Sequence, residues 1–184
     1  MNKIVISAFV ASMLAATSAQ AFDEDRKGFI LGLGAGISAI STEVTVDNDG
    51  YHDDASDSSV GFSTSLKIGY GFTDQFALYY VRNAAWFGYD HNDDNFVSGI
   101  SGVAANYYIA PKSPIYVMAG VGFGDFANFS EGEGEVGSAF MLGAGYEVYP
   151  HVQVEGSYLV TDIEESGLDF STDAFHLTVN YLWY

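Results

Sequence analysis

Apolar side chains recur at every second position in eight separate stretches of this 184-residue chain. The clearest stretch places Val60, Phe62, Thr64, Leu66, Ile68 and Tyr70 on one face. Successive side chains of a β-strand point to opposite faces, so this period of two indicates strands, and helical spacing is absent. The alternation therefore predicts eight strands over residues 28–39, 59–70, 75–87, 96–109, 115–124, 140–148, 152–160 and 175–183.

The two faces of these strands differ in a way that indicates a membrane barrel. One face carries Leu, Ile, Val, Phe and Tyr, and the other is crowded with Gly and Ser. Small residues suit the narrow interior of an eight-stranded barrel, and closure pairs every backbone group inside lipid. The strands, about 12 residues long, exceed the roughly 9–11 residues that a tilted strand needs to cross. We expect an all-β, eight-stranded antiparallel transmembrane barrel, with a soluble exported sandwich or lipocalin-like barrel as the alternative.

The connections between the strands alternate in length. Residues 71–74, 110–114 and 149–151 form short links, whereas 42–58, 88–95, 127–137 and 162–172 are longer. Short periplasmic turns and longer extracellular loops are typical of outer-membrane barrels, as are aromatic girdles at the two interfaces. The predicted girdle near the short turns consists of Phe29, Tyr70, Tyr107, Tyr146, Tyr181 and Trp183.

The first 21 residues have the features of a secretory signal peptide. Lys3 precedes an apolar run over 4–16, and Ala19-Gln20-Ala21 is a small-x-small cleavage site. The run is shorter than the roughly 20 residues that a membrane helix needs. We expect residues 1–21 to be cleaved and residues 22–184 to form one barrel domain in the cell outer membrane.

Composition excludes several classes of function. The chain has 6 Lys+Arg against 24 Asp+Glu, a formal charge of −18, which argues against nucleic acid as a partner. The absence of Cys removes disulfide frameworks, thiolate zinc sites and thiol nucleophiles. No cofactor is expected.

Four charged residues are predicted to face the lumen. They are Lys67, Arg82, Glu147 and Glu155. Buried charges must be paired, so we expect the two cations to meet the two anions across the lumen. This predicts either a structural barrel with a closed, ion-paired lumen or a narrow, low-conductance pore gated by the same charges. A wide porin would need about 16–18 strands.

Most acidic residues fall in the long connections, where we expect them to serve solubility. Asp47, Asp49, Asp90 and Asp94 are weak candidates for loosely bound divalent cations, which could bridge to lipopolysaccharide phosphates. Their spacing does not match an EF-hand loop. Contact with a host or a phage through these loops is a further, weaker possibility.

The histidines indicate no enzyme. Acyl chemistry needs a nucleophile, a base and an orienting group within hydrogen-bond reach, and the chain has no G-x-S-x-G motif. His176 is expected to face the lumen beside Ser38. The sequence therefore predicts no enzymatic activity, and a lipid-modifying barrel enzyme is the third and weakest hypothesis.

Residues 27–184 resemble the small outer-membrane β-barrel proteins of Gram-negative bacteria, the OmpA transmembrane-domain and OmpX-like group. The segments that carry the resemblance are Gly28-Phe29-Ile30-Leu31-Gly32-Leu33-Gly34-Ala35-Gly36, Gly69-Tyr70-Gly71-Phe72 and Gly143-Ala144-Gly145-Tyr146-Glu147. The resemblance implies a polar, mostly closed interior and a monomer. Its implied partners are outer-membrane lipids, lipopolysaccharide and the barrel-assembly machinery, which reads an aromatic last strand. In this chain the outward series ends at Trp183 and Tyr184 is extra, so the register of the last strand stays open.

Overall fold

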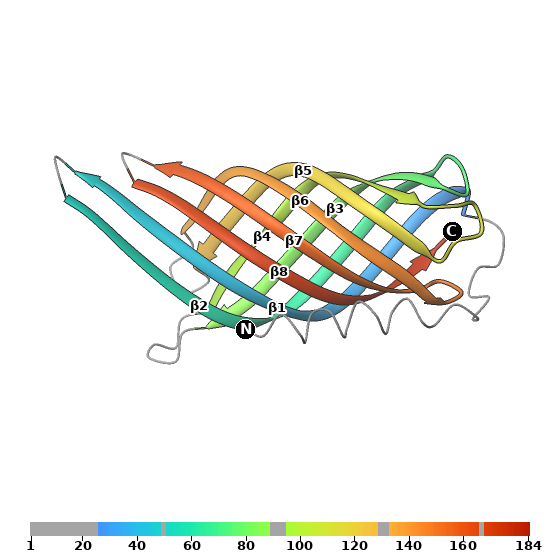
Figure 1. Cartoon of the computed structure of the whole chain (residues 1–184), viewed down its shortest axis with the longest axis horizontal. Coiled ribbons are helices and arrows are strands. Elements are labelled where there is room, and N and C mark those ends of the chain that lie inside the picture. The colour runs from blue at the N-terminus through green and yellow to red at the C-terminus, as the bar shows by residue number, and fades with distance from the viewer. Residues whose placement is uncertain (1–25, 49–50, 89–94, 129–132, 166–167) are drawn as a thin grey trace.

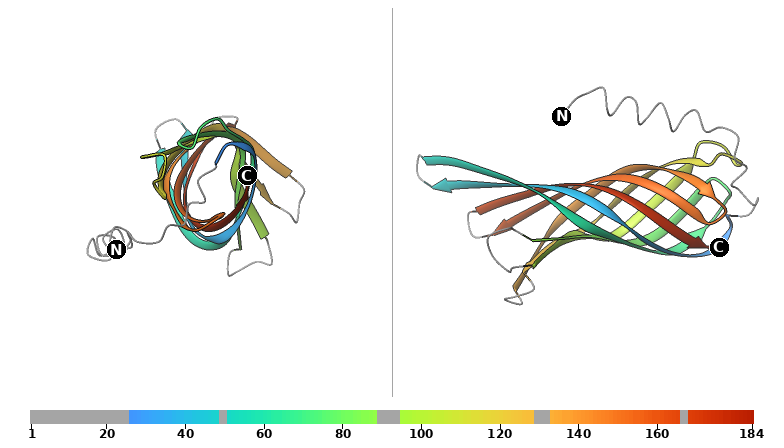
Figure 2. Two further views of the ribbon diagram at one scale, coloured as in Figure 1. Left: turned by 90° about the vertical axis from the view of Figure 1, so that its right-hand side faces the viewer. Right: turned by 90° about the horizontal axis from the view of Figure 1, so that it is seen from below.

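Eight antiparallel strands close into one barrel in the computed structural model, in which β1 pairs with both β2 and β8. The structure describes residues 26–48, 51–88, 95–128, 133–165 and 168–184, so the predicted signal peptide lies outside the described residues. The strands are β1 (Gly28–Asn48), β2 (Tyr51–Gly71), β3 (Phe76–Gly88), β4 (Asn95–Tyr108), β5 (Ile115–Asn128), β6 (Glu133–Tyr149), β7 (Val152–Glu165) and β8 (Leu168–Trp183). Figure 1 shows the barrel from the side, and Figure 2 includes a view close to its axis. The fold class predicted from the alternation is confirmed.

The strands are staggered around the barrel. We start at Leu33 of β1 and move from each residue to its partner on the next strand. One complete circuit of the barrel ends on β1 at Glu43, ten residues further along the strand. Such a stagger tilts the strands by about 35–45° to the barrel axis. With only eight strands, the interior is just wide enough for side chains to fill it.

Several strands are longer than the sequence predicted. Residues 42–58 were expected to be a loop, but β1 and β2 pair as far as Asn48↔Tyr51. Likewise, β1 and β8 pair as far as Val46↔Leu168, within the predicted loop 162–172. A backbone ladder needs no apolar side chains, so these acidic segments form strands without showing alternation. Figure 1 shows the β1–β2 and β7–β8 hairpins projecting at the same end of the barrel.

The faces of β3 are the reverse of those predicted. Its lumen-facing side chains are Ala77, Tyr79, Val81, Asn83, Ala85 and Phe87, all buried. Paired residues on neighbouring strands share a face. Tyr70 of β2 faces outward and pairs with Leu78, which places Tyr79 inside. Arg82 therefore lies on the outward face and not in the lumen. The prediction failed because both faces of β3 are apolar, so its one charge was assigned to the interior.

The short turns gather at the opposite end from the projecting hairpins. Tyr184, the C-terminal residue, lies at this end (Figure 1), and so does Arg26, whose guanidinium bonds to the carbonyls of Asp74 and Pro111 in two of the turns. β8 ends at Trp183, and Tyr184 packs against the buried cluster of Ile30, Ala77 and Leu182. The extra terminal residue thus lies at the mouth of the lumen, while Trp183 holds the last outward position.

The predicted girdle residues point away from the lumen. Phe29, Tyr70, Tyr107, Tyr181 and Trp183 are exposed, and Tyr146 is half-buried. Trp183 and Tyr181 stack edge to face at 4.6 Å between ring centroids. None of the described residues forms a helix long and apolar enough to cross a membrane.

Candidate functional site in the barrel lumen

The lumen is divided into an apolar layer and a polar layer. The apolar layer lies toward the long connections, where Phe87, Phe96 and Phe126 pack with ring centroids 5.6–6.2 Å apart. Buried Ile100, Met141 and Leu159 continue the same cluster down the lumen. The polar layer lies nearer the short turns and contains the buried charges. Apolar side chains therefore stand between these charges and the end with the projecting hairpins.

Arg26 closes the short-turn end of the polar layer. Its side chain is 2% exposed, and its Nε and Nη2 donate to Glu147 Oε2 at 3.1 and 2.6 Å. Nη1 donates to the carbonyls of Asp74 and Pro111, and Nη2 to that of Ser113. All five guanidinium N–H groups are thus bonded. One side chain ties two of the turns to the end of β6.

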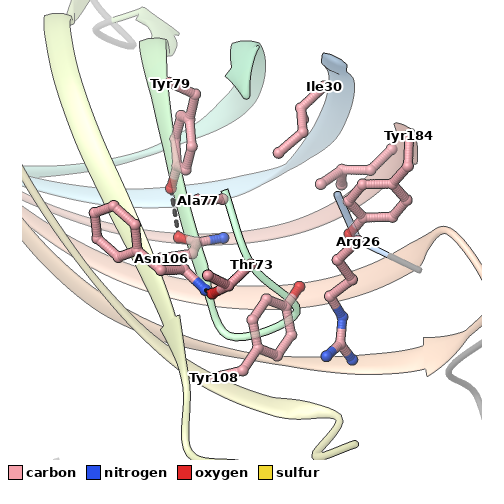
Figure 3. A pocket seen from close by; sticks show the side chains of 10 residues that line it. Arg26, Ile30, Thr73, Ala77, Tyr79, Asn106, Tyr108 and Tyr184 are labelled. Carbon is pink, nitrogen blue, oxygen red and sulfur yellow. Dashed lines mark hydrogen bonds between the residues drawn. The ribbon is translucent and has the colours of Figure 1, made fainter. Parts of the chain in front are cut away.

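Aromatic rings complete this end of the lumen. The Arg26 guanidinium lies 3.6 Å from the centre of the Tyr108 ring, a cation–π contact. Figure 3 shows Arg26, Tyr108 and Tyr184 around a small cavity, with the Tyr79 hydroxyl bonded to Asn106 at 2.5 Å. The cavity has a volume of about 10 Å³, which is space for one water at most.

Lys67 and Glu155 form the second buried ion pair. Both side chains are fully buried, and Lys67 Nζ donates to Glu155 Oε2. The Tyr116 hydroxyl lies 2.7 Å from Glu155 Oε2 and 2.9 Å from Gln153 Oε1. Gln153 Nε2 in turn donates to the Tyr108 hydroxyl at 2.7 Å. This network joins the second ion pair to the ring beneath Arg26.

The middle of the lumen also holds polar atoms that have no protein partner among the described residues. These atoms are Ser38 Oγ, Ser65 Oγ, Asn83 Oδ1, Glu155 Oε1, His176 Nε2 and Asn180 Oδ1. They come from β7, β8, β1, β2 and β3, five strands that are adjacent around the barrel. Buried polar atoms of this kind are commonly satisfied by ordered water.

The structure brings together only part of the predicted charge set. Lys67 and Glu155 meet, as the sequence allowed. Arg82 meets neither acid: its partner is Asp125, on the outward face of β5. Glu147 pairs instead with Arg26, which sequence reasoning missed because Arg26 precedes the first predicted strand. Its position, next to a strand that starts at the short turns, was the one available signal.

The predicted metal and histidine positions are only partly described. Asp49, Asp90 and Asp94 lie outside the described residues, and for Asp47 only the backbone is described. His176 faces the lumen and is opposite Ser38, but its Nδ1 bonds to Ser63 Oγ at 2.8 Å. Both side chains are fully buried, so this Ser–His pair is enclosed in the barrel. In the part of the chain that the structure describes, no three potential metal ligands come together.

Comparison with known proteins gives one family and several similar structures. Residues 7–182 match the family model described as outer membrane protein beta-barrel domain. Neisserial surface protein A (NspA) is 16% identical, with a TM-score of 0.51 over 81% of this chain and 96% of that chain. OprG of Pseudomonas aeruginosa is 13% identical, with a TM-score of 0.51 over 88% of this chain and 99% of that one. At such identities the likeness shows the fold alone. No curated protein sequence matches the chain.

Proposed function

Because the chain belongs to the outer membrane protein beta-barrel domain family, we propose that it is a structural integral protein of the outer membrane with a closed lumen. The observation that carries the proposal is the saturation of Arg26. A guanidinium with all five N–H groups bonded holds the short-turn end of the lumen in one arrangement. The phenylalanine cluster supports the same conclusion at the other end, since a dry apolar layer opposes the passage of ions.

A narrow pore is the second candidate, and a separate observation favours it. Six polar atoms in the middle of the lumen have no protein partner among the described residues, including one oxygen of Glu155. Water bound there would provide part of a conduction path. Such a pore would open by exchange of partners at Lys67–Glu155 and Arg26–Glu147 and by movement of the apolar layer.

Conductance in a planar bilayer separates these two functions. The samples are protein purified from the outer membrane and its Glu147→Ala, Glu155→Ala and Lys112→Ala variants. Lys112 is an exposed cation in a short turn, so its variant controls for a change of surface charge. We expect no discrete channels from the wild type or from Lys112→Ala. Channels in the wild type that change in either glutamate variant would refute the closed lumen and establish the pore.

Enzymatic activity is not part of the proposal. The one described Ser–His pair, Ser63 and His176, is enclosed in the lumen and away from the outward surface where a lipid substrate would lie. Expression of the protein is therefore expected to leave the mass of lipid A unchanged, and a mass shift would establish the third hypothesis. We further propose a monomer without a cofactor, assembled by the barrel-assembly machinery and surrounded by outer-membrane lipids. Divalent cations bound loosely at the acidic connections remain part of this proposal.

A further inference from the structure

Arg82 and Asp125 form an ion pair on the outward face of the barrel. Arg82 is half-buried at 26% and Asp125 at 30% side-chain exposure. Both Nη atoms donate to the Asp125 carboxylate, the Nη2–Oδ2 distance being 2.7 Å. The pair spans β4, which lies between β3 and β5. On the lipid-facing wall of a barrel a charge is costly, most of all near the middle of the bilayer, so this placement needs an explanation.

The wall of the barrel is shaped to let Arg82 reach Asp125. Arg82 pairs with Ser101 of β4, which pairs with Phe123 of β5, and Asp125 is the next outward position after Phe123. On β4, Gly99 lies under the guanidinium: a Cβ there would collide with the Asn83 carbonyl oxygen and would be 3.1 Å from Arg82 Nη1. The small residues Gly99 and Ser101 leave space for the long Arg82 side chain to cross β4. The Arg82 side chain therefore extends along the outward surface of the barrel toward the end with the projecting hairpins.

This direction carries the charge to the outer edge of the hydrocarbon. Trp86, Phe123 and Phe140 are exposed aromatic residues on the outward faces near the hairpin end, where an interfacial girdle is expected. Asp125 lies one outward position beyond Phe123 toward that end. Long basic side chains in membranes extend toward the interface in this way, with the aliphatic stem in lipid and the charge among polar headgroups.

The guanidinium has donors left over for a ligand. Asp125 takes two of its five N–H groups, and among the described residues no protein acceptor takes the other three. Among the described residues, Arg82 is the one basic residue that lies on the outward face in this half of the barrel. Lys67 is inside the lumen, Arg26, Lys27 and Lys112 lie at the short-turn end, and Lys3 is in the predicted signal peptide. An anionic headgroup in the outer leaflet thus finds one cation on this wall.

We propose that Arg82 and Asp125 bind the phosphorylated sugar headgroup of an outer-leaflet glycolipid. Arg82 donates to a phosphate, and Asp125 holds the guanidinium in place and accepts from a sugar hydroxyl or amide. Arginine is well suited to phosphate because its planar donors match the phosphate oxygens. The inference rests on the outer-membrane location included in the proposed function, but it does not depend on whether the lumen is closed.

The test is native mass spectrometry of the purified protein in detergent, titrated with bisphosphorylated lipid A or with its dephosphorylated form. EDTA is present throughout, so that contacts bridged by divalent cations to the acidic connections are removed. Arg82→Gln removes the charge and Lys112→Gln makes the same change at the short-turn end. Folding of each variant is checked by its heat-dependent migration on a gel. Conductance of Arg82→Gln is measured in parallel and reports on the lumen separately.

Loss of one charge-assisted contact should weaken binding of bisphosphorylated lipid A roughly tenfold in Arg82→Gln. Lys112→Gln should bind like the wild type, and dephosphorylated lipid A should bind weakly to all three proteins. Asp125→Asn should retain binding of the phosphorylated form, since the amide oxygen can still accept from Arg82 and from the sugar, while the carboxylate charge that repels phosphate is removed. The proposal is overturned if folded Arg82→Gln binds as tightly as the wild type. It is also overturned if Lys112→Gln loses as much, if phosphate makes no difference, or if Asp125→Asn loses the lipid.

Discussion

Replacing Arg26 by Ala should be among the most damaging single changes in this barrel. The substitution leaves Glu147, which is 1% exposed, as an uncompensated charge at the base of the lumen. Removing one partner of a buried ion pair costs about 3–5 kcal/mol. The carbonyls of Asp74, Pro111 and Ser113 also lose their donor, but they are only partly buried, so water can replace it at little further cost. We therefore expect the free energy of unfolding to fall by about 3–5 kcal/mol.

Equilibrium unfolding in urea, followed by tryptophan fluorescence in lipid vesicles, measures this loss. The matched control is Lys27→Ala, because Lys27 Nζ pairs with Asp74 at 3.2 Å but its side chain is 57% exposed. An exposed pair of this kind contributes about 0–1 kcal/mol. The double variant Arg26→Met/Glu147→Gln removes both charges. Its loss of stability should be smaller than the sum of the losses in Arg26→Met alone and Glu147→Gln alone. An Arg26→Ala loss no larger than that of Lys27→Ala, or additive losses in the double variant, would refute the buried-pair argument.

Two further tests probe the interior, each with its own comparison variant. Lys67→Ala leaves the fully buried Glu155 carboxylate without its cation and should cost about 3–5 kcal/mol in the same unfolding assay. The double variant Lys67→Met/Glu155→Gln should recover part of this loss. A loss below about 1 kcal/mol in Lys67→Ala would contradict the pairing. Gly145→Ala places a methyl group where the Tyr116 ring lies and should cost about 1–3 kcal/mol of stability. Gly156→Ala should cost clearly less, because its new Cβ would be 3.5 Å from the Phe175 ring. Equal losses in the two variants would show that the Tyr116 ring moves freely.

Where one face of a strand is small and the other is large, the sequence predicted the faces correctly. On β2, Phe62, Leu66 and Tyr70 alternate with Ser63, Lys67 and Gly69, and the structure places the first set outside. The interior of an eight-stranded barrel offers little space, so a face that is rich in small residues is expected to face inward. β3 lacks this asymmetry. The faces of β3 are fixed by its pairing with β2 and β4, and this pairing places Arg82 on the outward face.

Charge partners could not be read from the sequence for a related reason. A partner depends on stagger and on side-chain reach across strands that are far apart in the chain. Arg26 meets Glu147 because barrel closure brings the start of β1 and the end of β6 to the same mouth. Arg82 meets Asp125 because the register of β3, β4 and β5 places Asp125 within reach of the Arg82 side chain across β4.

The sequence by itself determined the eight strands, the outward apolar faces of every strand except β3, and the gathering of the short turns at one end of the barrel. These follow from local alternation and from the positions of the turn segments, which any barrel of this chain must satisfy. The tertiary structure alone decided the ten-residue stagger, the faces of β3 and the identity of each ion pair. It also decided the length of the projecting hairpins, since their acidic strands are held by backbone pairing to a neighbour and carry no periodic signal of their own.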